Sequence, residues 1–139
     1  MEDQIKVVFA GKEFSFDRKK VLAGFEGKDF AEVNVWLFKT LSNLAKEYAF
    51  WENLRCQIHK DEETKKSNYK QWLIKQKQTV DTKRYLSEMA KEDAAIAQDI
   101  NKYSELQKEI IDLTYLHDVV RTIVRSIEIY NNNLLVLKR

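Results

Sequence analysis

The residues best suited to chemistry are the lysines and aromatic residues between positions 64 and 80. This segment has no acidic residue, and Tyr69 and Trp72 stand among its lysines. Lysines neutralise phosphates without reading base sequence, and aromatic rings stack on unpaired bases at roughly 1–3 kcal/mol each. The pattern predicts contact with single-stranded nucleic acid through Lys65, Lys66, Tyr69, Lys70, Trp72, Lys75 and Lys77. The competing interpretation is that Trp72 packs in the core with Leu73 and Ile74, and that the lysines form only a solvated face.

Other groups that could support catalysis or bind a metal are few. Cys56 and His59 are three residues apart, and His117 is the only other histidine, so a zinc site or a catalytic dyad would lack ligands. The acidic run 61–63 could hold a divalent ion, although such a run is more often a solvated surface. All three glycines fall in the first 27 residues, without the spacing of a phosphate-binding loop. We therefore expect no enzyme activity, no metal and no cofactor.

The elements that position the basic segment are predicted to be long helices. After Gly27 the chain has no further glycine, and it has no proline at all. Glycine costs roughly 1 kcal/mol and proline roughly 3 kcal/mol inside a helix, so nothing here forces a helix to stop. We expect a mainly α fold with two regions in one structural domain: residues 1–27, a β-hairpin and a short helix, and residues 28–139, the long helices for DNA binding and oligomerisation.

The N-terminal segment 5–17 has the alternating pattern of a β-hairpin. Its turn is predicted at Gly11 and Lys12, which would set Phe9 opposite Phe14 and Val7 opposite Phe16. A lone hairpin is marginal in water, so its apolar face should pack on the helices or on a neighbouring subunit. A short helix capped by Asp17 should follow.

The first long helix is predicted over residues 29–58, beginning at Asp29. Apolar residues recur there every seven positions, and Leu41 and Tyr48 form a second stripe between them. Past Ile58 the repeat fails, which predicts a solvated loop or a loose helix over roughly 60–80. Thr79 or Asp81 is then the expected N-cap of the next helix. The members of the seven-residue repeat are Phe30, Leu37, Leu44, Trp51 and Ile58.

The last helix is predicted over about 99–138 and has the most regular repeat. One chain offers only one other long helix to cover its apolar stripes, so we expect subunits to associate as an oligomeric helical bundle or ring. The residues expected in that interface are Tyr103, Leu106, Ile110, Leu113, Val120, Val124, Ile127 and Leu134.

The remaining composition indicates a soluble chain. A single cysteine excludes an internal disulfide, and no apolar run approaches the length of a membrane span. The N-terminus lacks the basic-then-apolar order of a secretion signal, so a cytoplasmic location is expected, in the bacterial host if the gene is from a phage.

The stretch Arg84-Tyr85, followed by Ser87-Glu88-Met89, resembles the UvsY-type recombination mediators of tailed phages. The similarity extends to an apolar helix over 35–58, a basic patch after it, and a long helix with Tyr103 and an Arg-Ser-Ile-Glu-Ile segment at 125–129. The hairpin resembles the start of longer-tailed relatives. A departure is the lone Arg55 before Cys56-Gln57-Ile58. The resemblance assigns the family's DNA-binding patch to Arg55, Lys60, Lys65 and Lys66.

The resemblance implies a recombination mediator without catalysis. Such a protein binds single-stranded DNA as an oligomer, loosens the grip of a single-strand-binding protein and helps to load a RecA-like recombinase. The alternative is a helical docking or inhibitory module that contacts another protein through its charged faces and binds no nucleic acid.

Overall fold

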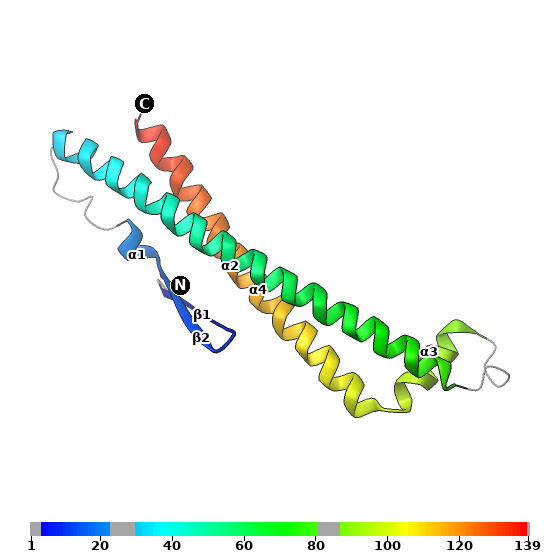
Figure 1. The fold of residues 1–139 in the computed structure, drawn as a ribbon. Coiled ribbons are helices and arrows are strands. Elements are labelled where there is room, and N and C mark those ends of the chain that lie inside the picture. The colour runs from blue at the N-terminus through cyan, green and yellow to red at the C-terminus, as the bar shows by residue number, and fades with distance from the viewer. Residues whose placement is uncertain (1–3, 23–29, 81–86, 139) are drawn as a thin grey trace. The chain divides into compact units, whose positions relative to one another are not determined.

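The computed structural model of the chain describes residues 4–22, 30–80 and 87–138. Within them a two-stranded antiparallel hairpin precedes the helices, so the expected mainly α class is confirmed. The elements are β1 (Gln4–Phe9), β2 (Lys12–Asp17), α1 (Arg18–Val21), α2 (Phe30–Gln78), α3 (Glu88–Ala97) and α4 (Ile100–Lys138) (Figure 1). Among the described helices, none is long and apolar enough to cross a membrane.

The chain divides into two compact units. The first, called here the hairpin unit, comprises Met1–Ile58 and Leu116–Arg139, and the second, the α3 unit, comprises His59–Tyr115. Within each unit a part of α2 lies beside a part of α4. Figure 1 shows the cyan part of α2 next to the orange and red part of α4 in the hairpin unit, and green next to yellow in the α3 unit.

The hairpin forms where it was expected, but with a different turn. Ala10 and Gly11 occupy the turn with φ of 52° and 75°, and Phe9 pairs with Lys12. The predicted turn at Gly11 and Lys12 was therefore wrong, as were the pairs Phe9–Phe14 and Val7–Phe16: Val7 lies opposite Phe14, and Ile5 opposite Phe16. Both central residues of a type I′ turn need positive φ. In this turn the exposed Ala10 adopts positive φ together with Gly11, and Lys12 is left in the strand. A shift of two residues keeps the same side chains on the same face.

The apolar face of the hairpin packs on α2 of its own unit. Val7 and Phe16 are each 1% exposed. The Phe16 ring meets Trp51 edge-on at 6.0 Å, and Phe14 meets Phe50 at 5.6 Å. The helix of four residues that follows is capped as predicted, because the Lys20 amide donates to Asp17 Oδ1 at 3.2 Å. The expected start of the first long helix at Asp29 lies outside the described residues.

The core of the hairpin unit confirms the seven-residue repeat of α2. Leu37, Leu44, Trp51 and Ile58 are buried, while the Phe30 side chain lies outside the described ones. The second stripe was wrong: Leu41 is half-buried and Tyr48 is 37% exposed, whereas Thr40 and Leu54 are buried. The hairpin is a second packing partner for α2, and it draws the buried surface toward residues 40 and 54. The opposing side chains of α4 are Val120, Ile123, Val124, Ile127 and Leu134.

In the α3 unit, α2 continues as a helix to Gln78. Of the two alternatives predicted for roughly 60–80, the solvated loop is therefore wrong, and the chain is helical up to Gln78. The apolar repeat ends at Ile58, yet no glycine or proline stops the backbone, and polar side chains take over the inward positions. Glu62 is 4% exposed there. Thr79 ends α2, with its hydroxyl donating to the Gln76 carbonyl at 2.8 Å. Thr79 is therefore not the next N-cap, and the other candidate, Asp81, lies outside the described residues.

Two short polar motifs set the remaining boundaries. Ser87 caps α3, accepting the Ala90 amide at 3.1 Å, and Asp99 caps α4, accepting the Lys102 amide at 3.1 Å. The fully buried Ala95 allows α3 to approach α2, where Gln76 Nε2 donates to its carbonyl at 3.4 Å. The last helix thus begins at Ile100 and runs to Lys138, close to the predicted bounds.

Candidate nucleic-acid interface

The nine residues predicted to contact DNA fall into groups with different surroundings. Eight belong to the α3 unit, and Arg55 belongs to the hairpin unit. Three of the eight are exposed lysines without an ion pair, three are lysines with acidic neighbours, and two are half-buried aromatic residues.

The exposed lysines without an ion pair, called here the outer lysines, are Lys60, Lys70 and Lys75. Within the part of the chain that the structure describes, no carboxylate lies within ion-pair distance of them. At about 1.5 Å per residue, they are spaced by roughly 15 Å and 8 Å along the helix axis. All three side chains are exposed. Their ammonium groups are therefore available to an anionic partner.

The second group of lysines bridges α2 to acids around it. Lys65 Nζ lies 3.7 Å from Glu109 on α4, and Lys66 Nζ lies 3.5 Å from Glu63. Lys77 lies between Glu88 and Glu92 of α3, at 3.8 and 3.9 Å. The acids of 92–118 and the basic segment, separate in the sequence, thus partly neutralise each other here. Ion pairs this exposed contribute about 1 kcal/mol at most, so a phosphate can compete for these lysines.

The aromatic residues contact other rings of the unit. The Tyr69 ring lies 6.1 Å from Trp72 and 6.1 Å from Tyr103 of α4. Burial first, and then Tyr103 and the Glu92 carboxylate, raise the pKa of the Tyr69 hydroxyl. Both side chains on α2 are half-buried, so part of each ring is engaged within the unit and part stays accessible.

Arg55 is engaged within the hairpin unit. Its Nε donates to both carboxylate oxygens of Glu52, at 3.0 and 3.1 Å, and its Nη1 donates to His117 Nε2 at 3.2 Å. The hydrogen bond to Glu52 raises the pKa of Arg55, and the same bond holds the pKa of Glu52 below its usual value, against the effect of burial. Because these contacts fix the guanidinium within its own unit, Arg55 is less available to DNA than the outer lysines.

The groups considered for catalysis or metal binding have contacts within their units. Cys56 is exposed, and its thiol lies 3.7 Å from Glu52 Oε1. In the acidic run, Glu62 lies 3.5 Å from His59 Nδ1 and 3.9 Å from Lys66 Nζ.

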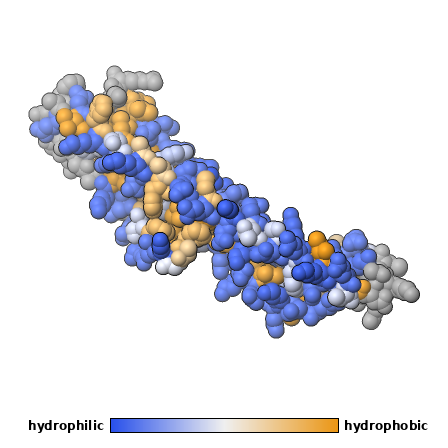
Figure 2. Space-filling view, in the orientation of Figure 1, coloured by the Kyte–Doolittle hydropathy of each residue, from blue (hydrophilic) through white to orange (hydrophobic). Residues whose placement is uncertain are grey.

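Five of the eight residues expected in a subunit interface are buried within the single chain: Leu106, Val120, Val124, Ile127 and Leu134. Tyr103, Ile110 and Leu113 are half-buried. Large apolar side chains remain exposed elsewhere, including Val35 at 56% and Phe38 at 69% on α2, and Val136 at 68% on α4. Figure 2 shows orange patches over the hairpin unit, whereas the visible face of the α3 unit is mostly blue.

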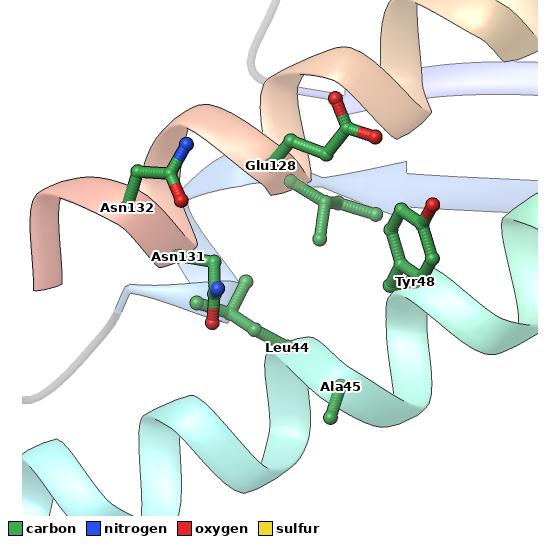
Figure 3. Close-up of a pocket in the computed structure, with 7 residues that line it drawn as sticks. Leu44, Ala45, Tyr48, Glu128, Asn131 and Asn132 are labelled. Atoms are coloured by element: carbon green, nitrogen blue, oxygen red, sulfur yellow. The ribbon is translucent and has the colours of Figure 1, made fainter. Parts of the chain in front are cut away.

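A feature that the sequence did not single out is a groove between α2 and α4 in the hairpin unit. It is lined by Tyr48, Glu128, Asn131 and Asn132, with Leu44, Ala45 and Ile127 (Figure 3). One sequence signal was present: Asn131 occupies a position of the seven-residue repeat that is otherwise largely apolar. Comparisons of this chain with protein-family models, with curated proteins and with solved structures found no match. The resemblance to the UvsY-type mediators therefore stays a prediction.

Proposed function

We propose that the protein binds single-stranded nucleic acid through the outer side of α2 in the α3 unit. The observation that carries this proposal is the group of outer lysines: three exposed ammonium groups on a helix segment, two of them within a stretch that has no acid for 17 residues, 64–80. Such a surface attracts phosphates without selecting a base sequence.

Further contacts can come from the paired lysines and the aromatic residues. Lys65 and Lys66 can leave their exposed glutamates for a phosphate, because each surface ion pair contributes little. Tyr69 and Trp72 keep part of their ring surface accessible, which suits an unpaired base more than a base pair. Lys77 and Arg55 have more intramolecular contacts, so they contribute less to nucleic-acid binding.

The wider role that this binding supports is recombination mediation. In that role the protein would act as a homo-oligomer, loosen a single-strand-binding protein on DNA and help to load a RecA-like recombinase. Linked subunits would raise the avidity of a weak patch without new contacts. The apolar side chains still exposed on the hairpin unit, Val35, Phe38 and Val136 among them, are the surface proposed for subunit contact.

The test is a salt titration with a fluorescein-labelled oligothymidylate and a variant carrying Lys60→Ala, Lys70→Ala and Lys75→Ala. On single strands each lost phosphate contact lowers the slope of log affinity against log salt by about 0.7, so the triple variant should lose about 2 from the slope. Its affinity at low salt should fall at least about tenfold.

The matched control removes three exposed lysines of the hairpin unit: Lys12→Ala, Lys39→Ala and Lys46→Ala. It changes the net charge equally and should keep the slope of the unsubstituted protein. Equal slopes for the two triple variants would show that net charge, and not the outer side of α2, governs binding.

The docking module is the second candidate. It is favoured by the ion pairs of Lys65, Lys66 and Lys77, which already neutralise part of the basic segment. Absence of binding by the unsubstituted protein at low salt would select this candidate.

A further inference from the structure

The groove between α2 and α4 in the hairpin unit has the dimensions of a small-molecule site. Its volume is about 460 Å³. Sites for small ligands are typically about 300–1,000 Å³, with an apolar lining and a few placed polar groups. Here Leu44, Ala45 and Ile127 supply the apolar lining. Figure 3 shows Tyr48 and Glu128 at one end of the groove, and Asn131 and Asn132 at the other.

The electrostatic character of the groove is set by one carboxylate. Among the described residues that line the groove, Glu128 alone is charged. No cation of the described residues lies within ion-pair distance of Glu128, and Arg121, two turns before it on α4, is paired with Asp118. A bound anion would meet this negative charge, and an entirely apolar ligand would not neutralise it.

Tyr48 reinforces this preference. Figure 3 shows Tyr48 at the same end of the groove as Glu128, and burial, followed by the Glu52 and Glu128 carboxylates, raises the pKa of the Tyr48 hydroxyl. The phenol therefore stays protonated, and its oxygen lone pairs can accept a hydrogen bond. The ring face adds a favourable surface for a cation.

We propose that this groove binds a small aliphatic amine, with the ammonium group at Glu128 and Tyr48. The carboxylate and the phenol oxygen accept two of its three N–H bonds, and the methylene chain covers Leu44, Ala45 and Ile127. The amides of Asn131 and Asn132 can bind a second polar group at the far end. This site is independent of the nucleic-acid function, because none of its residues belongs to the α3 unit.

The proposal is tested by titrating the full chain with three probes of equal length: pentylammonium, 1-pentanol and pentanoate. Two-dimensional NMR follows the Tyr48 ring and the Ile127 methyl groups. Pentylammonium should give saturable shifts at both residues, with pentanol at least about tenfold weaker, because a hydrogen bond to a charged group is roughly twice as strong as a neutral one. Equal affinity for pentanol or pentanoate would overturn the proposal, as would the lack of saturable shifts.

Two variants localise the effect. Glu128→Gln keeps the shape of the side chain and removes its charge, and should weaken pentylammonium binding at least about tenfold. Glu13→Gln makes the same change at an exposed glutamate of the hairpin, which pairs only loosely with Lys6 at 4.0 Å, and should leave binding unchanged. Unchanged binding by Glu128→Gln would overturn the proposal. A lysine side chain carries the same chemistry, so Nα-acetyl-lysine methylamide is a fourth probe, and its affinity relative to pentylammonium tells a peptide source from a free amine.

Discussion

The hairpin unit and the α3 unit use the same two helices but hold them together differently. In the hairpin unit the contacts are apolar: Trp51, Ile58 and Ile123 are at most 1% exposed. In the α3 unit the corresponding contacts include an ion pair between Lys65 and Glu109 and a ring contact between Tyr69 and Tyr103. One buried residue there is an acid, Glu62.

This difference shows how one helix can combine stability with a polar surface. Burial of apolar area contributes about 25 cal/mol per Å², whereas an exposed ion pair contributes little. The hairpin unit can therefore supply most of the folding free energy. The α3 unit can then keep a basic, solvated surface without an apolar stripe to cover it.

The largest expected effect tests the apolar core. Trp51→Ala removes the ring that meets Phe16 and Phe50, together with the indole N–H that donates to Glu47 Oε2 at 2.9 Å. It should lower the free energy of unfolding by about 3–5 kcal/mol in urea denaturation. The matched variant Trp72→Ala in the half-buried cluster of the α3 unit should cost clearly less. Equal costs would contradict the comparison.

The second prediction measures the two units within one protein. Amide hydrogen exchange, followed by mass spectrometry, should be at least about tenfold slower for residues 44–58 of α2 than for residues 64–78, because opening the latter exposes less apolar area. Both segments have 15 residues of the same helix, so they are matched in length and in secondary structure. Equal protection would mean that the polar contacts of the α3 unit hold the helix as firmly as the apolar core does.

The third prediction concerns the turn at Ala10 and Gly11, which joins β1 and β2 and sets their pairing register. Ala10 has a φ of 52°, a conformation that costs a non-glycine residue about 1–2 kcal/mol, and Asn is preferred before Gly in such turns. Ala10→Asn should raise the free energy of unfolding by about 0.5–1 kcal/mol. Ala10→Val should lower it, since a β-branched side chain is strained at positive φ. No difference between Asn and Val would show that the turn is not formed in solution.

The smallest effect is a pH dependence in the hairpin unit. Arg55 holds the pKa of Glu52 below its usual value of 4.5, so the pair contributes stability above about pH 4.5 and loses it as the pH falls through the lowered pKa. The contribution should stay below about 1 kcal/mol. Denaturation at neutral and acidic pH should therefore show a slightly smaller acid loss for Glu52→Gln. An unchanged acid loss would mean that the pair contributes nothing measurable.

Much of the fold could be predicted because it depends on local signals. The hairpin followed from alternation, the cap at Asp17 from a side chain that can accept an amide, and the buried face at Leu37, Leu44, Trp51 and Ile58 from spacing. The position of the turn could not be predicted. The choice between Ala10–Gly11 and Gly11–Lys12 depends on which pairing register of β1 and β2 is more stable overall. The loop alternative for 60–80 was wrong because the loss of an apolar repeat does not by itself end a helix.

The candidate site was predictable only in composition. The sequence shows that residues 64–80 are basic and aromatic, but it does not show which ammonium groups are neutralised. The pairing of Lys65 with Glu109 joins residues 44 positions apart, and the groove at Tyr48 and Glu128 joins residues 80 positions apart. Such contacts depend on the register between α2 and α4, which a repeat within one helix does not specify.

The sequence by itself determined that the chain after Gly27 has a high helical propensity and is basic between 64 and 80, because backbone propensity and charge are properties of individual residues. Only the tertiary structure decided that α2 continues to Gln78, that Tyr69 contacts Tyr103, and that no carboxylate of the described residues pairs with Lys60, Lys70 or Lys75. The physical reason is that burial and charge pairing depend on the neighbours that a second helix brings, and those neighbours lie far away along the chain.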